Sequence, residues 1–228
     1  MKTIGLIGGM SWQSTIDYYR IINQAIVSRT EGQHSAKIVI DSVDFGEVED
    51  LHINKDLSGL TTLLINSARK LESAGAEILM IGANTMHFAA GSVSENISIP
   101  LVNILEESIK VIQEKGLTKV GLLGTKFTME QDFFKNQLVF NGIAVNVPVM
   151  EDRDFIQHVI FRELFNAFIN PESKKRFLSI MDGLADDGAQ GIILGCTEIP
   201  MIIRQEDTIL PVFDTTTIHA LAAVELAL

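Results

Sequence analysis

The chain has 228 residues, of which 46% are apolar, enough to form the core of one large domain or two small ones. A formal net charge of −11 argues against nucleic acid or an anionic membrane as a main partner. The single cysteine, Cys196, excludes an internal disulfide and a multi-cysteine metal site. Because no apolar run is long enough to span a membrane and the N-terminus lacks an export signal, we expect a cytoplasmic protein.

Short apolar runs alternate along the chain with longer amphipathic stretches. The short runs predict strands at 2–7, 36–43, 78–82, 101–103, 119–123, 144–148, 191–195 and 212–214. Apolar residues spaced by three and four predict helices at 14–27, 57–74, 105–115, 129–141, 154–170, 174–188 and 217–226. This alternation predicts an α/β fold, in which doubly wound parallel sheets carry helices on both faces.

The two halves of the chain resemble each other. Matched positions are Gly5 and Gly121, Gly82 and Gly195, and Pro100 and Pro211, with separations of 116, 113 and 111 residues. Surface loops absorb a drift of this size, so the repeat predicts two pseudo-symmetric lobes facing one ligand cleft. We place the lobes at 1–116 and 117–216 and leave open which of them the closing helix 217–228 packs on.

Four turns that follow predicted strands carry the candidate chemistry. They are Gly8-Gly9-Met10-Ser11, Ala83-Asn84-Thr85-Met86-His87, Gly124-Thr125-Lys126-Phe127-Thr128 and Gly195-Cys196-Thr197-Glu198. Ligands of parallel sheets collect at such turns, where backbone N–H groups and hydroxyls suit a carboxylate. The simpler alternatives are a tight glycine turn without a ligand and helix caps made by Asn84 and Thr85. The first turn lacks the full G-x-G-x-x-G pattern, which disfavours dinucleotide binding.

Cys196 precedes two residues that favour a helix N-terminus. A helix dipole there stabilises thiolate over thiol, which predicts a reactive sulfur rather than an inert core residue. Two interpretations of Glu198 remain: it orients Cys196 or an ammonium group, or it only complements the helix dipole. For His87 we favour a ring satisfied by the backbone over a group that acts at the site. The histidines lack metal-ligand spacing, so we predict no metal.

In these four motifs the chain resembles the aspartate/glutamate racemase superfamily, specifically its cofactor-independent amino-acid racemases. The resemblance runs along nearly the whole chain and includes Ser42-Val43-Asp44-Phe45 and the segment Pro211-Val212-Phe213-Asp214-Thr215. It implies two pseudo-symmetric α/β lobes with a ligand between them, no cofactor and a homodimer. The implied substrate is a small amino acid, for which we expect an acidic one such as aspartate or glutamate.

In that family two cysteines flank the substrate α-carbon, one removing the proton as a thiolate and the other returning a proton from the opposite face. By the resemblance, Cys196 is the second cysteine, and Asn84, Thr85 and Thr197 hold the carboxylate. Met10, Ser11, Thr125, Thr128 and Glu198 complete the implied substrate-binding set.

Ala83 stands where the first cysteine belongs, and alanine cannot move a proton. A water held by Ser11 or Asn84, or the carboxylate of Asp44, is the candidate replacement. The chain is therefore expected to be an amino-acid racemase altered by the loss of one thiol.

Two alternatives remain open. Arylmalonate decarboxylases look like the same superfamily and keep only the second cysteine, which favours a lyase. A non-catalytic amino-acid binding protein is the other. For an acidic substrate side chain, Lys126, Arg153 and Arg162 are candidate partners on the strength of their charge alone.

Overall fold

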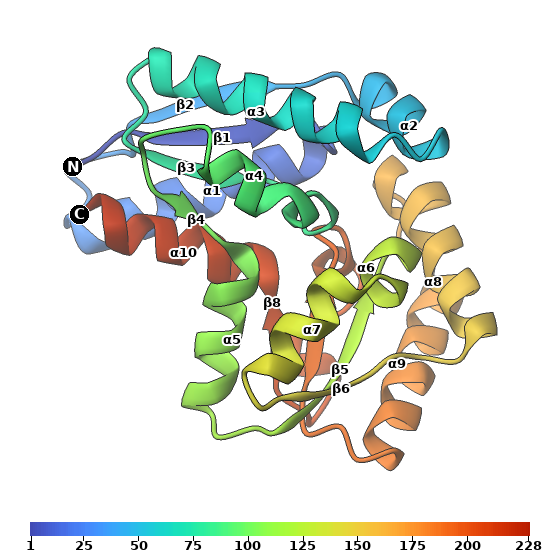
Figure 1. Cartoon of the computed structure of the whole chain (residues 1–228). Coiled ribbons are helices and arrows are strands. Elements are labelled where there is room, and N and C mark those ends of the chain that lie inside the picture. Colours follow the sequence, from blue (N-terminus) through green and yellow to red (C-terminus); the bar gives the residue numbers. More distant parts are fainter. The chain divides into compact units, whose positions relative to one another are not determined.

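The computed structural model describes all 228 residues, and helices alternate with strands throughout (Figure 1). The strands are β1 (Ile4–Gly8), β2 (Ile38–Ser42), β3 (Ile78–Ile81), β4 (Leu101–Val102), β5 (Lys119–Gly124), β6 (Ala144–Asn146), β7 (Ile192–Gly195) and β8 (Val212–Asp214). The α-helices are α1 (Trp12–Arg29), α2 (Phe45–Ile53), α3 (Leu57–Ser73), α4 (Ala90–Ser94), α5 (Ile104–Glu114), α6 (Lys126–Glu130), α7 (Asp132–Phe140), α8 (Met150–Arg162), α9 (Pro171–Asp186) and α10 (Thr215–Ala227). Four short 3₁₀ helices are η1 (Thr85–Ala89), η2 (Leu164–Asn166), η3 (Ile199–Met201) and η4 (Gln205–Asp207).

The chain forms two compact units. Unit 1 contains Met1–Glu107 and Thr216–Leu228, and unit 2 contains Ser108–Thr215. Each unit contains one four-stranded sheet. The strand order is β2-β1-β3-β4 in unit 1 and β6-β5-β7-β8 in unit 2, and all neighbouring strands are parallel. The predicted α/β fold with two parallel-sheet lobes is confirmed, and the identical strand order is the structural counterpart of the sequence repeat.

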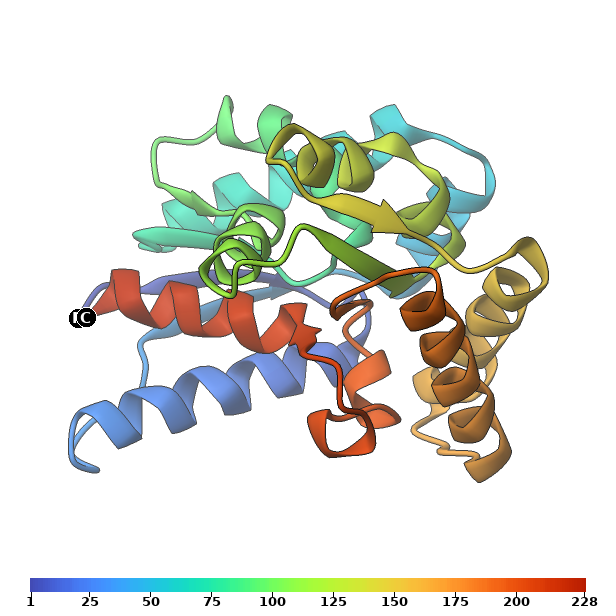
Figure 2. The same cartoon turned by 90° about the horizontal axis from the view of Figure 1, so that it is seen from below.

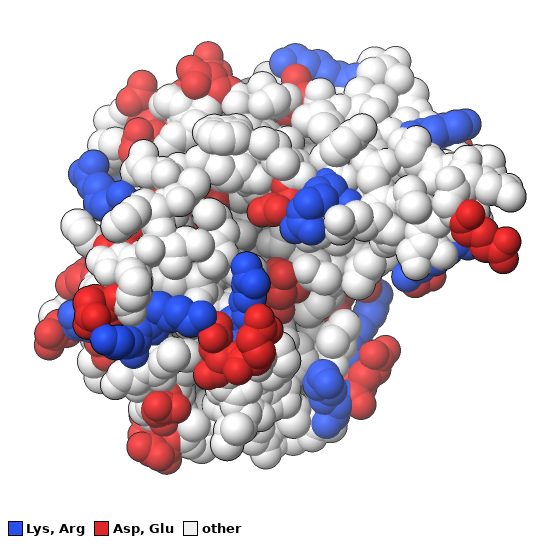
Figure 3. Space-filling model, turned by 180° about the vertical axis from the view of Figure 1, so that it is seen from behind, with Lys and Arg blue, Asp and Glu red and all other residues white.

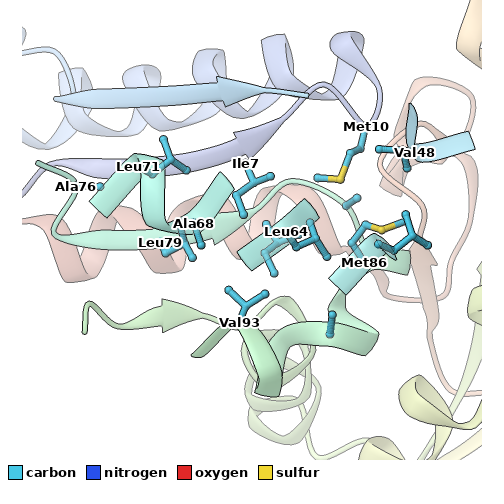
Figure 4. Close-up of a cluster of buried hydrophobic side chains, with 14 residues drawn as sticks. Ile7, Met10, Val48, Leu64, Ala68, Leu71, Ala76, Leu79, Met86 and Val93 are labelled. Carbon is cyan, nitrogen blue, oxygen red and sulfur yellow. The ribbon is translucent and has the colours of Figure 1, made fainter. Parts of the chain in front are cut away.

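The sheet of unit 1 is covered on both faces (Figures 1 and 2). On one face, Leu64, Ala68 and Leu71 of α3 pack with Ile7 and Leu79 (Figure 4). On the other face, residues of α1 and α10 pack against the alternate strand positions. That cluster includes Ile4, Leu6, Tyr18, Ile22, Ile26, Ile78, Met80, Ala220, Ala223, Val224 and Ala227. Successive strand residues serve opposite faces, so β1 and β3 have continuous apolar sequences.

Helix α10 belongs to unit 1, although it follows the last strand of unit 2. The amide of Lys2 donates to the carbonyl of Ala227 at 2.8 Å, and the two termini lie side by side (Figures 1 and 2). The division between the units falls inside α5, at Glu107, rather than at the 116/117 boundary placed from the sequence.

In unit 2, α8 and α9 supply most of the buried helical side chains. Phe177, Ile180, Met181 and Leu184 are buried on α9. The helix comes so close to the sheet that a Cβ at Gly121 would lie 2.9 Å from Leu184 Cδ1. Helix α9 begins at Pro171, where Asn170 accepts a hydrogen bond from the amide of Glu172.

Two predicted helices differ from the structure. The helix expected at 129–141 is divided into α6 and α7 by Gln131, whose backbone is extended at φ −75° and ψ 152°. The helix expected at 154–170 begins earlier, at Met150, and ends at Arg162. Helices α2 and α4 were not predicted because each is short and buries few residues, which leaves little apolar periodicity.

Basic and acidic side chains alternate over the face drawn in Figure 3, with no extended area of one sign. Many charged side chains of this protein form ion pairs, such as Lys174 with Asp207 at 2.7 Å. No helix combines the length and the apolar character that crossing a membrane requires.

Candidate functional site

The turn between β1 and α1 is fixed by backbone contacts. Gly9 has φ +87°, and a Cβ there would lie 2.1 Å from the carbonyl oxygen of Val43. Its N–H donates to Thr15 Oγ1 at 2.9 Å, so this donor is already used inside the turn. Ser11 caps α1 by accepting from the amide of Ser14 at 3.3 Å. The side chain of Met10 packs in the apolar cluster that contains Val48 (Figure 4).

The second turn of unit 1 follows β3 and lies beside the first. The amide of Gly82 donates to the carbonyl of Ile7 at 2.9 Å, which holds the ends of β1 and β3 together. Ala83 and Asn84 are buried directly before η1, which begins at Thr85. Asn84 has helical φ and ψ, and its side chain makes no capping bond, so the interpretation of Asn84 as a helix cap is wrong.

His87 is held by two backbone groups. Its Nδ1 lies 2.9 Å from the carbonyl oxygen of Ala83, and its Nε2 accepts from the amide of Ile104 at 3.2 Å. Burial lowers the pKa of His87 to about 4, against the backbone hydrogen bond, which raises it. The prediction that His87 is satisfied by the backbone is confirmed.

A second buried imidazole, His219 of α10, packs edge-on against His87 with ring centroids 5.5 Å apart. Its Nε2 lies 2.8 Å from the carbonyl oxygen of Val102, and its Nδ1 lies 2.9 Å from the hydroxyl of Tyr18. Burial, reinforced by the neighbouring His87, lowers the pKa of His219 to about 3. The roles of Tyr18 and His219 were not predicted from the sequence, in which their only signal is a polar group in an otherwise apolar helix face.

In unit 2, β5 and β7 are neighbours, and Gly124 pairs with Gly195. A Cβ at Gly124 would lie 2.9 Å from the carbonyl oxygen of Gly195, so these glycines allow the two strand ends to approach closely. The turns that begin at Thr125 and Cys196 therefore start side by side. Thr125 caps α6, and its Oγ1 lies 3.1 Å from Thr128 Oγ1.

Cys196 is buried and bonded to a carboxylate. Its Sγ donates to Glu198 Oε2 at 2.9 Å, and the hydroxyl of Thr197 donates to the same oxygen at 2.9 Å. Burial, and then the Glu198 carboxylate, raise the pKa of Cys196 well above its usual value. The prediction of a stabilised thiolate is wrong for this conformation, because burial and the Glu198 carboxylate both favour the thiol. The following helical turn, η3, has only 3 residues, so its dipole does not offset these two effects.

Two of the three cationic candidates in unit 2, Lys126 and Arg153, already have carboxylate partners. Lys126 Nζ lies 2.5 Å from Asp154 Oδ1, and the hydrogen bond to Asp154 raises the pKa of Lys126. Arg153 lies 3.3 Å from Glu130, while Arg162 is exposed at the end of α8. An acidic ligand would have to compete with these internal carboxylates for Lys126 and Arg153.

The remaining candidates are placed as follows. Asp44 is exposed and caps α2, accepting from the amide of Gly46 at 3.1 Å. No cluster of three or more His, Cys, Asp or Glu side chains has an arrangement suited to a metal ion. Unit 1 brings together the turns that contain Ser11 and Asn84, and unit 2 brings together those that contain Thr125 and Cys196.

Comparison with known proteins gives full-length matches. The broad specificity amino-acid racemase RacX of Bacillus subtilis (strain 168) is 24% identical over 227 residues, which cover 97% of this chain and 96% of RacX. The solved structure of a Yersinia pestis protein assigned to the Asp/Glu racemases is 43% identical, with a TM-score of 0.93 and coverage of 100% of this chain and 99% of that one.

The solved structure of an aspartate racemase homologue from Pyrococcus horikoshii OT3 is 35% identical, with a TM-score of 0.87 over 100% of this chain and 99% of that one. The sequence profile of the Asp/Glu/Hydantoin racemase family matches residues 7–223, a range that contains all four motif turns. The chain therefore belongs to the Asp/Glu/Hydantoin racemase family.

Proposed function

We propose that the protein is a cofactor-independent amino-acid racemase that acts on an acidic amino acid, with Cys196 as its proton-transfer group. Membership of the racemase family supports the class of reaction. The observation that carries the assignment of Cys196 is its hydrogen bond to Glu198 at the carboxyl end of β7. A buried thiol next to a carboxylate has a partner that can take up and return its proton.

The reaction breaks the α-C–H bond on one face of the substrate and forms a new one on the other. In its resting thiol form, Cys196 serves the second step: the S–H bond breaks, the proton goes to the α-carbon, and sulfur remains as thiolate. A thiolate beside an ionised Glu198 is unfavourable, so the sulfur is reprotonated before the next turnover. The base on the opposite face releases the α-proton to solvent, and Glu198 takes up one proton from solvent and passes it to the sulfur, which restores the thiol and leaves no net proton change.

Because alanine at position 83 cannot accept a proton, another group must act as the base on the opposite face. A water held by Ser11 or Asn84, or the Asp44 carboxylate, would accept the α-proton. In this proposal Asn84, Thr85 and Thr197 hold the substrate carboxylate, and Met10, Ser11, Thr125 and Thr128 complete its surroundings. The homodimer and the cytoplasmic location remain predictions.

Proton NMR in D₂O, with L- and D-aspartate and L- and D-glutamate in turn, tests the proposal when combined with chiral analysis of the product. The wild-type protein should exchange the α-proton with inversion. Cys196→Ala should reduce exchange by about 10²–10⁴-fold, the usual contribution of a general acid or base, while substrate binding is retained. Unchanged exchange in Cys196→Ala would remove this thiol from the mechanism.

Two further variants test the partners of Cys196. Glu198→Gln keeps the side-chain size but cannot store a proton, so exchange should fall by about 10-fold or more. Ala83→Cys supplies a second thiol and should increase inversion. Asp44→Asn separates the two candidate bases, because it lowers exchange only if the Asp44 carboxylate accepts the α-proton.

A single-cysteine decarboxylase is the second candidate function. It is favoured by a thiol that rests protonated in a chain that has alanine at position 83, because protonation of a carbanion on one face needs only one acid. Release of CO₂ from an arylmalonate, without α-proton exchange of any amino acid, would replace the racemase proposal with this one. Binding of aspartate or glutamate without exchange would instead indicate a non-catalytic binding protein.

A further inference from the structure

The His87 ring has one fixed protonation state because of what it contacts. A backbone carbonyl can only accept a hydrogen bond, so Nδ1 must carry a proton toward the oxygen of Ala83 at 2.9 Å. A backbone amide can only donate, so Nε2 must be unprotonated toward Ile104 at 3.2 Å. His87 is therefore neutral, with its proton on Nδ1, and only 4% of the residue is exposed.

This hydrogen bond also fixes a peptide plane. The chain has no cis peptide bonds, and in a trans peptide the carbonyl and the following N–H point in opposite directions. Holding the oxygen of Ala83 toward His87 therefore directs the N–H of Asn84 away from His87. A rotation of this peptide by half a turn would reverse both groups and break the Nδ1 bond.

We propose that His87 is a positioning residue, whose Nδ1–H selects this orientation of the Ala83–Asn84 peptide and so sets the direction of the Asn84 N–H. The functional consequence rests on the proposed racemase function, which assigns the turn to the substrate carboxylate. The geometric part does not depend on it. A carboxylate is bound best by donors whose directions are fixed before it arrives.

A second layer holds the His87 ring. The carbonyl of Val102 accepts from Nε2–H of His219, and Nδ1 of His219 accepts from the Tyr18 hydroxyl. The two imidazoles thus form hydrogen bonds with backbone groups on either side of residue 103, just after β4. His219 binds the carbonyl of Val102, and His87 binds the amide of Ile104. Rings that are buried and fully hydrogen-bonded have one orientation, which a positioning role requires.

Two matched variants separate positioning from space filling. Asparagine places an amide donor near the Nδ1 position, so His87→Asn can keep the bond to Ala83 and lose the one to Ile104. Glutamine places an oxygen near the Nε2 position, so His87→Gln can keep the acceptor for Ile104 and lose the donor to Ala83. Each variant loses one buried hydrogen bond, so similar decreases in thermal stability are expected for both.

The deciding measurement is NMR of the ligand-free proteins. The ¹⁵N shifts of the wild-type ring should identify the Nδ1–H tautomer. The residual dipolar coupling of the Asn84 N–H, together with the nuclear Overhauser effect between Ala83 Hα and Asn84 HN, should be unchanged in His87→Asn and altered in His87→Gln. An Nε2–H tautomer, or the same peptide orientation in both variants, would overturn the proposal.

A kinetic measurement links the geometry to the proposed reaction. For the enantiomer of aspartate or glutamate that the wild type exchanges, KM should rise about 10-fold in His87→Gln, as for the loss of one aligned donor to a carboxylate. KM should stay within about 2-fold of wild type in His87→Asn. An equal rise in both variants would contradict positioning, whereas absence of exchange in the wild type would contradict only the proposed function.

Discussion

Gly9 is a residue whose identity is dictated by its surroundings. Its φ of +87° is strained for any side chain, and a Cβ would overlap the backbone of Val43 at 2.1 Å. The glycine therefore allows the end of β1 to pass directly beside the chain that leaves β2. The glycine pair could be recognised in the sequence, but the steric reason lies in a segment more than thirty residues away.

Gly9→Ala should lower the free energy of unfolding by about 3 kcal/mol or more, because backbone strain adds to a clash that no rotamer relieves. Gly32→Ala is the matched control, with φ +81° and no atom within 4 Å of the added Cβ. It should cost only about 1–2 kcal/mol, the penalty for a left-handed conformation. Urea denaturation of both variants measures the difference, and equal losses would contradict the clash.

Cys196 and Glu198 show where residue-level reasoning fails. The sequence correctly placed the thiol at a strand end, but the direction of its pKa shift depends on the side-chain conformation of Glu198 and on burial. A carboxylate two residues along the chain could equally have pointed into solvent. Local sequence does not specify which of these conformations the packing selects.

At the scale of elements, α1 and α10 are joined by polar groups inside an apolar interface. Tyr18 of α1 and His219 of α10 are 201 residues apart in the chain. The Tyr18 hydroxyl forms a hydrogen bond with Nδ1 of His219 at 2.9 Å. The neighbouring His87 connects this pair to the turn after β3. Because each polar atom of the two rings has a partner, the network links four elements without leaving unsatisfied ring nitrogens.

This network predicts a pH dependence of stability. The pKa of His87 is about 4 and that of His219 about 3 in the fold, against 6.5 for an ordinary histidine. Above pH 6.5 the two histidines are neutral in both the folded and the unfolded protein, so the free energy of unfolding carries no penalty from their protonation. Below that pH the histidines become protonated in the unfolded chain but stay neutral in the folded protein. The free energy of unfolding should therefore fall by about 1.4 kcal/mol per pH unit for each histidine.

Urea titrations between pH 7 and pH 4.5 measure this slope. His219→Gln, in which the amide can still donate to Val102, should have a slope smaller by about 1.4 kcal/mol per pH unit. His34→Gln removes an exposed histidine and should leave the slope as in the wild type. Equal slopes in the wild type and His219→Gln would show that His219 is not held neutral.

At the scale of the whole molecule, unit 1 is built from two separate stretches of chain. Residues 216–228 return to it after unit 2 is complete, and the Lys2 amide bonds to the Ala227 carbonyl. The two termini therefore lie close enough to be joined by a short linker. The contacts within unit 1 therefore do not depend on the order in which its two segments follow one another along the chain.

A circular permutant that begins at Leu117, joins Leu228 to Met1 through a short glycine-serine linker and ends at Gly116 should fold. Its melting temperature should lie within about 5 °C of the wild type, since no buried element is interrupted. A control permutant opened between Leu64 and Ile65 cuts α3, where Leu64 is buried, and should not fold. Failure of the first permutant would contradict the closeness of the termini.

The sequence by itself determined the eight strands, the parallel α/β class and the repeat. Short continuous apolar runs mark strands buried on both faces, and apolar residues spaced by three and four mark the buried side of a helix. It also placed the motif turns at strand ends. Helix α10 shows the limit of this information. It is apolar nearly all round, so no stripe in its sequence distinguishes the side that packs on α1 from the side that does not.

Only the tertiary structure decided the partners of the buried polar groups. The protonation of Cys196, the tautomers of His87 and His219, and the need for glycine at position 9 each depend on an atom brought close by folding. The contacts of His219 and Gly9 come from distant parts of the chain. The contact of His87 spans four residues, and that of Cys196 spans two and depends on one rotamer of Glu198. Sequence patterns record burial as an average over an element, whereas this chemistry depends on individual contacts of about 3 Å.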